Sequence, residues 1–285
     1  MRNLGYYNGE SGPIEEMRVP MSDRVCFFGD GVYDTAVSHN EVIFALDEHV
    51  DRFFRSAGLL EMTPPLSKRE LGRLLNELNA KVDGPTKFVY WQLTRGTAPR
   101  EHAFAADMKA NLWVTVTPTV LQDKLNPVKL ITLEDTRFLH CNIKTLNLLP
   151  NVLAAEKARR AGAAEAVFHR GGRVTECAHS NVHILKDGVF QTPPADNLIL
   201  GGITRLHLLA MCKKLGIPAK EEPFTLEELF GADEVVVSAC TRSCLPASHI
   251  DGKPVGGKAP DLLKKLQNGM LAEFYEGVGV KAAGI

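Results

Sequence analysis

The sequence contains no apolar run long enough to cross a membrane and no block of lysine or arginine. A spanning helix needs about 18 or more consecutive apolar residues, and no segment approaches that length. The 33 basic and 34 acidic residues nearly cancel, with a formal net charge of −1. Nucleic acid and anionic membranes attract proteins with a positive face, so neither is expected as a partner. A small molecule is expected instead.

Cysteine is scarce, and its spacing does not suggest a metal site. The six cysteines include no C-x-x-C pair, and the two closest, Cys240 and Cys244, have no second Cys/His pair at zinc-finger spacing. The N-terminal residues also lack the apolar segment of a secretory signal. We therefore expect reduced thiols, no bound metal and a cytoplasmic protein.

The remaining composition is that of a soluble globular protein. With 45% hydrophobic and 24% charged residues among 285, the chain is too apolar for disorder and long enough for one or two domains with a large core. Alternating helix and strand patterns predict an α/β fold, with a small α+β domain followed by a larger α/β domain.

The small domain is expected over residues 1–118. Ser67 and Glu70 have the spacing of a capping box, and leucines follow on one face, so a helix is predicted from about 68 to 82. Residues 87–95 and 112–118 have the β-branched and aromatic content of strands. Residues 41–46 are also β-prone, and a helix is expected to begin at Asp47.

The larger domain is expected over residues 126–285, after a linker at 119–125 marked by polar residues and proline. Thr225 and Glu228 form a second capping box, which predicts a short helix. The active site is expected where the two domains meet. Strands are predicted at 129–133, 165–169, 181–185 and 234–239, and helices near 149–161, 204–216 and 260–276.

Lys144 is the first residue whose surroundings suggest chemistry. It lies among Ile143, Leu146, Leu148 and Leu149, and partial desolvation lowers an amine's pKa and favours Schiff-base formation. The alternative is a lysine that extends from an apolar segment to water. Residue type and neighbours leave both readings open.

Two further segments combine small residues with polar groups. In GGRVTECAHSN (171–181), Glu176 precedes a turn whose donors could bind phosphate, while its carboxylate could hold a ring nitrogen protonated. In LGGITR (200–205), two glycines precede a helix whose first amides could bind an anion. An exposed hairpin and an ordinary helix start are the alternatives.

Two arginine-containing segments could recognise anions. His49 and Arg52 are neighbours on one predicted helical face, where Arg52 could bind a phosphate or carboxylate. Arg95, Arg100 and His102 crowd into a loop after a strand, an arrangement suited to a substrate carboxylate. A charged surface helix and a solvated basic loop would look the same.

Taken together and in this order, the segments resemble the fold-type IV pyridoxal-phosphate enzymes, the class-IV aminotransferases. The matching segments are FGDGVYD (28–34), LDEHVDRF (46–53), CNIKTLNLLPNVLA (141–154), VTECAHSN (174–181) and GGITR (201–205). The resemblance covers nearly the whole chain. Tyr33 and the RGTAPREH loop are similar to the branch of D-amino-acid aminotransferases.

The resemblance implies pyridoxal 5′-phosphate as cofactor and a role for each candidate. Lys144 would form the internal aldimine and move the Cα proton, and Glu176 would pair with the pyridine nitrogen. Arg24, Arg137 and Glu165 would be charges around Glu176, or else surface ion pairs. The implied cofactor-binding residues are Arg52, Lys144, Glu176, Ser180, Ile203, Thr204 and Thr241, and the implied substrate-binding residues are Tyr33, Arg100 and His102.

Several positions depart from the family's pattern. Cys177 stands where glycine is expected after the glutamate, and His179 stands in a turn of small hydroxyl residues. Ala239 and Cys240 replace hydroxyl residues near the phosphate, and Arg242 follows Thr241. These changes put the substrate range in doubt.

The implied reaction is a ping-pong transamination between a D-amino acid, such as D-alanine or D-glutamate, and a 2-oxo acid, carried by a homodimer. A branched-chain L-amino-acid aminotransferase and an aminodeoxychorismate lyase are the alternatives within the same fold. A non-catalytic binding protein is the alternative outside it.

Overall fold

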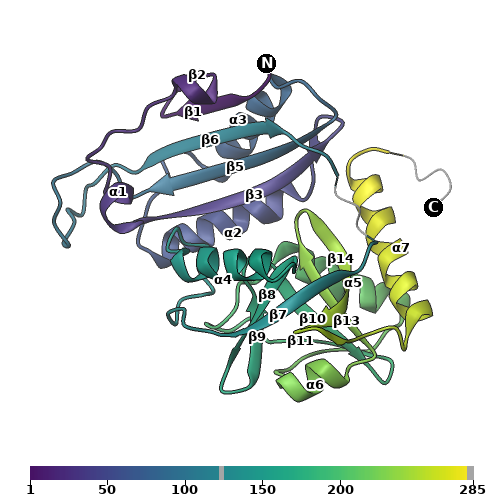
Figure 1. The fold of residues 1–285 in the computed structure, drawn as a ribbon. Coiled ribbons are helices and arrows are strands. Elements are labelled where there is room, and N and C mark those ends of the chain that lie inside the picture. The colour runs from purple at the N-terminus through teal and green to yellow at the C-terminus, as the bar shows by residue number, and fades with distance from the viewer. Residues whose placement is uncertain (122–124, 281–285) are drawn as a thin grey trace. The chain divides into compact units, whose positions relative to one another are not determined.

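The computed structural model describes residues 1–121 and 125–280, except for the side chain of Arg242, and the chain divides into two compact units. The first unit comprises Met1–Leu121, the short segment Ile143–Asn147 and a piece that begins at Glu276. The second comprises residues 125–142 and 148–275 (Figure 1). Part of the predicted linker, 122–124, lies outside the described residues. The predicted division differs in assigning residues 143–147 to the second domain.

An antiparallel six-stranded sheet forms the first unit, in the order β2-β1-β6-β5-β3-β4 (Figure 1). Its long strands carry the β-branched and aromatic residues that predicted strands at 87–95 and 112–118, and both predictions are confirmed. The strands are β1 (Leu4–Tyr7), β2 (Glu10–Gly12), β3 (Gly31–His39), β4 (Val42–Ile43), β5 (Thr86–Thr94) and β6 (Asn111–Pro118).

Two amphipathic helices, α2 (Leu46–Leu59) and α3 (Lys68–Ala80), cover one face of this sheet and bury its alternate residues. Phe53 and Leu75 from the helices pack with Trp91 of β5 in the core. The Ser67–Glu70 capping box is present as predicted, because each side chain accepts a hydrogen bond from the other residue's backbone amide.

The segment predicted as β-prone at 41–46 is mostly not a strand. Only Val42 and Ile43 pair with β3, and the chain then leaves the sheet edge through Ala45, whose φ of 52° lies in the left-handed region. Helix α2 therefore begins at Leu46, one residue before the predicted start. A 3₁₀ turn at Ile14–Glu16 and the short helix α1 (Arg24–Phe28) were not predicted.

The second unit contains a nine-stranded mixed sheet in the order β12-β11-β10-β13-β14-β7-β8-β9, with β15 paired to β14. The four predicted strands are confirmed as β7, β8, β10 and β13; the others are additional. The strands are β7 (Val128–Glu134), β8 (Glu165–Arg170), β9 (Arg173–Cys177), β10 (Asn181–Lys186), β11 (Val189–Thr192), β12 (Ala219–Glu221), β13 (Glu234–Ala239), β14 (Arg242–Ile250) and β15 (Lys253–Pro254).

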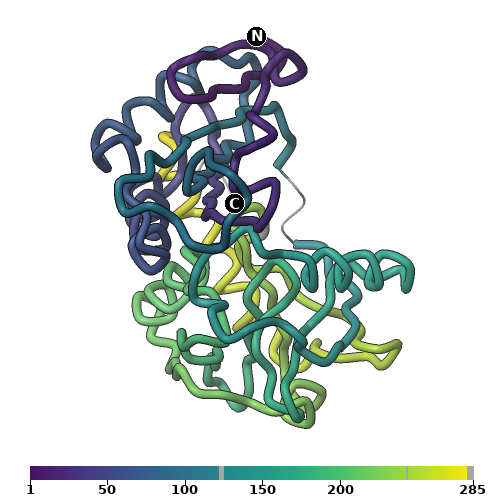
Figure 2. The backbone as a smooth tube through the Cα atoms, turned by 90° about the vertical axis from the view of Figure 1, so that its left-hand side faces the viewer, coloured from purple at the N-terminus to yellow at the C-terminus, as the bar shows by residue number. Residues whose placement is uncertain are grey.

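Four helices pack around this sheet, and their positions match the predictions. They are α4 (Leu149–Arg160), α5 (Ile203–Leu215), α6 (Leu226–Gly231) and α7 (Pro260–Gly277). The Thr225–Glu228 capping box opens α6 as predicted. The tube in Figure 2 follows the chain through these helices and strands.

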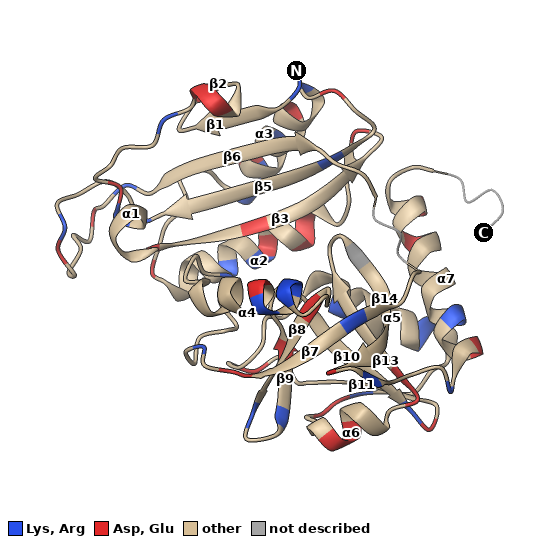
Figure 3. Cartoon of the chain, in the orientation of Figure 1, with Lys and Arg blue, Asp and Glu red and all other residues tan. Residues whose placement is uncertain are grey.

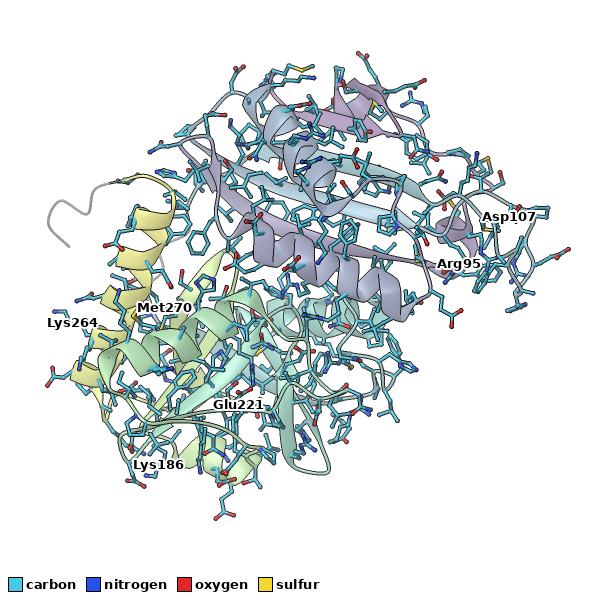
Figure 4. All side chains as sticks on the ribbon, turned by 180° about the vertical axis from the view of Figure 1, so that it is seen from behind. Arg95, Asp107, Lys186, Glu221, Lys264 and Met270 are labelled. Atoms are coloured by element: carbon cyan, nitrogen blue, oxygen red, sulfur yellow. The ribbon has the colours of Figure 1, made fainter. Side chains whose placement is uncertain are left out.

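A buried polar network fixes the start of α5. Arg205 donates through Nη2 to the Pro193 carbonyl at 2.8 Å and to Glu221 (labelled in Figure 4) at 2.6 Å, and through Nε to Thr192 Oγ1 at 3.1 Å. The ring of His183 joins the same Thr192 hydroxyl, at 2.9 Å, to Ser238 Oγ, at 2.8 Å. Burial lowers the pKa of His183 to about 3, so the ring is neutral at pH 7.

Acidic and basic side chains are interspersed along both units (Figure 3), in keeping with the balanced net charge. Among the described residues, no helix has the length and apolar character needed to span a membrane. Within the same residues, no group of three histidine, cysteine or acidic side chains is placed to hold a metal ion.

Candidate active site

In the first unit, Lys144 lies on a segment that pairs with the start of β3. Tyr33 N donates to the Lys144 carbonyl at 2.9 Å, and Leu146 N donates to the Gly31 carbonyl at 3.1 Å. Gly31 has no room for a side chain, because a Cβ there would overlap the Leu93 carbonyl oxygen and would crowd Leu146 Cδ1. The segment is therefore held against the strand by its backbone.

The amine of Lys144 lies over an aromatic ring. Its Nζ is 4.3 Å from the ring centroid of Tyr33, which stacks in turn on Tyr90 at 5.5 Å. The Lys144 amide donates to Ser56 Oγ of α2 at 3.2 Å. Lys144 is half-buried, so its amine sits between a protein surface and space open to a ligand. The structure thus brings together Tyr33 and Lys144, two of the residues selected from the sequence.

Arg52 is held by a buried carboxylate that the sequence reading did not select. Asp34 of β3 accepts two hydrogen bonds from Arg52, at 2.6 and 2.9 Å, and one contact from His49 Nδ1 at 2.9 Å. All three side chains are almost fully buried. Burial alone would raise the pKa of Asp34, but the Arg52 charge and the hydrogen bonds from His49 and Arg52 outweigh it and hold that pKa well below its usual range.

Arg100 and His102 lie in the loop of residues 96–110 that joins β5 to β6. Both side chains are exposed and both contact Phe28 of α1, with Arg100 Cζ 5.3 Å and the His102 ring centroid 5.2 Å from the ring. Arg95, which the sequence grouped with them, is buried and pairs with Asp30 at 2.9 Å. The loop therefore presents one arginine and one histidine to a ligand.

Glu176, at the end of β9, is the best-supported carboxylate of the second unit. Its Oε1 accepts from Arg137 Nη1 at 2.5 Å, and its Oε2 accepts from Asn181 Nδ2 at 3.1 Å and from the Leu200 amide at 3.0 Å. Arg137 also makes two hydrogen bonds to Asp135, each at 2.9 Å. These contacts keep Glu176 ionised and fix its direction, and the predicted pairing with Arg137 is present.

The turn after Glu176 is supported by Glu165. Ser180 Oγ donates to Glu165 at 2.7 Å, as does the His179 amide, and the His179 ring contacts the same carboxylate at 3.1 Å. Cys177 is 1% exposed and packs in the core beside Val167, which explains why a larger residue replaces glycine there. Glu165 thus acts on the turn and on Ser180.

Arg24 was expected beside Glu176, but its described hydrogen bonds place it elsewhere. It belongs to the first unit, where its guanidinium donates to Asp30 at 2.8 Å and to carbonyl oxygens of the 96–110 loop. The multiple donors of a guanidinium suit this arrangement. The predicted position near Glu176 therefore has no support in these contacts.

The first turn of α5 offers backbone amides without a competing side chain. Gly202 is its N-cap and makes no side-chain cap, so the amides of Ile203 and Thr204 begin the helix. A Cβ at Gly202 would overlap Asn181 Oδ1. Asn181 Nδ2 also donates to the Leu200 carbonyl at 2.9 Å. Asn181 therefore joins this turn to Glu176.

Thr241 lies in the turn between β13 and β14, half-buried, next to the half-buried Cys240. The side chain of Arg242, which the sequence reading also questioned, lies outside the described ones. Residues 238–241 continue the strand that contains Ser238, so the His183 network supports this turn as well.

The sequence reading missed the residues that orient the candidates. Asp34 was within a matched motif, and its even spacing from Val32 and Ala36 on β3 could have indicated a buried carboxylate needing an arginine partner. Asn181 opens a strand that was correctly predicted, yet its amide contacts depend on the fold of 198–202. Neither partner can be read from local spacing alone.

Replacing Asp34 with alanine is expected to destabilise the protein by about 3 to 5 kcal/mol at pH 7, because Arg52 would keep a buried charge without its carboxylate. The depressed pKa of Asp34 stabilises the fold above the unfolded carboxyl pKa of about 4, and this contribution is lost as pH falls. The variant should therefore also lose part of the wild-type sensitivity to acid. Urea unfolding at pH 7 and pH 4 measures both effects.

Asp51→Ala is the matched control on α2. Its side chain is 62% exposed and pairs with the exposed Lys68, so its loss should leave the unfolding midpoint nearly unchanged. An Asp34→Ala protein as stable as the Asp51→Ala protein would contradict the assignment of Asp34 as the anchor of Arg52.

Comparison with known proteins identifies the family. Residues 31–250 match the model of the family described as amino-transferase class IV. The chain is 44% identical over 271 residues to a D-alanine aminotransferase of Listeria monocytogenes serotype 4b (strain F2365), covering 93% of this chain and 94% of that protein. It is 39% identical over 277 residues to a D-alanine aminotransferase of Bacillus licheniformis, covering 94% and 97%.

Solved structures show the same fold. The branched-chain amino acid aminotransferase of Escherichia coli superposes with a TM-score of 0.89 at 23% identity, over 99% of this chain and 97% of that chain. A branched-chain amino acid aminotransferase from T.th., solved with pyridoxamine 5′-phosphate, gives 0.85 at 25% identity, over 98% and 95%. The predicted fold-type IV architecture is confirmed, and the chain belongs to the class IV aminotransferases, which are pyridoxal-phosphate enzymes.

Proposed function

We propose that the protein is a D-amino-acid transaminase, which moves the amino group of a D-amino acid such as D-alanine or D-glutamate to a 2-oxo acid. The observation that carries the proposal is the Lys144 amine 4.3 Å from the Tyr33 ring, in the same unit as the loop with Arg100 and His102. The 44% identity to a D-alanine aminotransferase over most of both chains supports the same activity.

The donor sets of both units fit pyridoxal 5′-phosphate. The ionised Glu176 suits a protonated pyridine nitrogen, because Arg137, Asn181 and the Leu200 amide leave it negatively charged and fixed. The uncapped start of α5 suits a phosphate, since free amides and the helix dipole favour an anion. In this proposal Arg52, Ser180, Thr241 and the amides of Ile203 and Thr204 hold the phosphate end.

The bound cofactor supplies an electron sink that makes the substrate Cα–H bond acidic. Lys144 provides the amine that holds the cofactor and then moves the proton from the substrate Cα. Its position suits both roles, because the backbone is fixed by Tyr33 and Ser56 while the long side chain keeps rotational freedom. Release of the first 2-oxo acid before the second binds makes the kinetics ping-pong.

Tyr33, Arg100 and His102 bind the α-carboxylate of the substrate in this proposal. A guanidinium and an imidazole on one exposed loop offer several charged donors to a single carboxylate. By fixing that carboxylate, they set which face of Cα is presented to Lys144, so the trap selects the D-enantiomer. A branched-chain L-aminotransferase is the second candidate, because the solved structures of that group share the fold.

A donor panel separates these activities. With 2-oxoglutarate as acceptor, the enzyme should form glutamate from L-leucine slowly or not at all; with D-alanine it should form D-glutamate and pyruvate at a high rate. The products are measured by chiral chromatography. Rapid turnover of L-leucine with none of D-alanine would overturn the proposal, and pyruvate formed from aminodeoxychorismate without an acceptor would favour a lyase.

Replacement of Lys144 with alanine should abolish transamination and remove the visible absorption of the lysine-bound cofactor, because no other amine takes its place. Lys157→Ala is the control, since Lys157 is an exposed residue of α4. It should keep the wild-type spectrum and rate. A Lys144→Ala protein with wild-type absorption would exclude Lys144 as the cofactor lysine.

We also propose that the enzyme is a homodimer, with helix α4 in the contact. The helix exposes Leu149, Val152 and Leu153, at 70%, 60% and 55% of their surfaces, a cost to a monomer in water. Sedimentation should give twice the chain mass of 31.3 kDa. Val152→Glu/Leu153→Glu should shift the protein towards monomer, whereas Arg159→Glu on the same helix should not. A monomeric wild-type protein would contradict this assembly.

A cytoplasmic location agrees with the chemistry of the thiols. Cys212 and Cys244 are buried, and burial raises the pKa of Cys212 to about 11, which keeps it as an inert thiol. Cell fractionation tests the location, and recovery with a periplasmic or secreted marker would contradict it.

A further inference from the structure

One buried arginine holds the backbone of the 96–110 loop. Arg24 of α1 donates through Nη1 to the Glu101 carbonyl at 2.6 Å and to the Ala103 carbonyl at 3.5 Å, and through Nη2 to the His102 carbonyl at 3.2 Å. Its side chain is 4% exposed. Three consecutive peptide carbonyls therefore converge on one guanidinium, and these are the peptides that follow Arg100.

Asp30 fixes the direction of that guanidinium. It accepts from Arg24 Nε at 2.8 Å and from Arg95 Nε at 2.9 and 3.0 Å. Arg95 in turn donates to the Leu60 carbonyl, at the end of α2, at 2.8 Å. The carboxylate of Asp30 thus connects the loop to a helix of the core, and it lowers the cost of burying two positive charges side by side.

Two phenylalanines complete the support. Phe28 is contacted by Arg24 at 4.9 Å on its ring and also by Arg100 and His102. Phe104 lies against Arg95, whose Cζ is 3.8 Å from the ring centroid. Figure 4 labels Arg95, where the loop begins, and Asp107 near its end. The exposed residues of the loop therefore rest on cation–π contacts made by the buried arginines and Arg100.

The ends of the loop are also fixed, so the middle is what Arg24 controls. Thr94 Oγ1 and Asn111 Nδ2, from the strands on either side, both donate to Asp23, at 2.8 and 2.9 Å. The Arg24 amide donates to the Gly96 carbonyl at 2.9 Å. Between these anchors, residues 100–104 contact the side chains of Arg24, Arg95 and Phe28.

We propose that Arg24, oriented by Asp30, is a positioning residue that sets the loop so that Arg100 and His102 present their side chains to the substrate carboxylate. The inference rests on the proposed carboxylate-binding role of those two residues. Arg24 itself acts through the loop backbone. A lysine would keep the charge but could not reach three carbonyls and Asp30 in one plane.

The test compares Arg24→Lys and Asp30→Asn with wild type. Both should raise KM for D-alanine about tenfold, because small displacements of a binding group carry penalties of this size or larger. The visible spectrum of the loaded enzyme and kcat should change by less than about threefold on the same argument. Arg18→Lys is the control: Arg18 is exposed and also bonds backbone carbonyls, those of Glu15 and Met17, and it should leave KM unchanged.

A double variant shows whether Arg24 acts through Arg100. If it does, Arg24→Lys/Arg100→Ala should have a KM close to that of Arg100→Ala alone, because the side chain being positioned is already absent. Independent contributions would instead multiply the two increases in KM. Multiplicative effects would overturn the proposal.

Limited trypsin digestion reads the loop without any turnover. Cleavage after Arg100, followed by mass spectrometry, should be faster in Arg24→Lys and Asp30→Asn than in wild type or Arg18→Lys, at equal thermal midpoints for the rest of the fold. Unchanged cleavage together with unchanged KM would overturn the inference, as would loss of the cofactor spectrum along with the rise in KM.

These readouts also separate the inference from the proposed function. If wild type uses L-leucine and not D-alanine, the D-amino-acid activity fails, and the Arg24 variants are then judged by KM for L-leucine and by cleavage after Arg100. Changes in both would support positioning by Arg24 under either substrate. Changes in neither would reject it.

Discussion

The backbone pairing between β3 and the segment that contains Lys144 is the contact on which the candidate site depends. It brings a lysine more than one hundred residues away in sequence against Tyr33, and it places the Lys144 amide on Ser56 of α2. Gly31 is essential to this pairing, because a Cβ there would collide with backbone and with Leu146. The reactive side chain is thus positioned by main-chain hydrogen bonds, which leave its own four methylene groups able to move.

Buried acidic groups orient the arginines throughout both units. Asp34 holds Arg52, Asp30 holds Arg24 and Arg95, and Asp135 holds Arg137. In each case a carboxylate behind the guanidinium limits its rotation and offsets its burial. This arrangement suits an enzyme that must bind anions at several places while the whole chain stays nearly neutral.

Local patterns in the sequence predicted the elements well, and tertiary contacts account for what they missed. The capping boxes at Ser67 and Thr225 mark helix starts through neighbouring residues, so they can be read directly. The short β4 depends on where the chain leaves the sheet edge, and the placement of Lys144 in the first unit depends on pairing with β3. The roles of Asp30, Asp34 and Asn181 could not be predicted because their partners lie 5 to 65 residues away.

The close approach of Asn181 to Gly202 links two positions that local sequence treats as separate. The amide oxygen of Asn181 occupies the volume that a methyl group on residue 202 would fill, while its nitrogen bonds Glu176 and the Leu200 carbonyl. An alanine at 202 would therefore displace the side chain that helps to aim Glu176. Among relatives of this enzyme, the two positions are free to vary only together, and a change at the helix start that tolerates a side chain must be preceded by a smaller residue at 181.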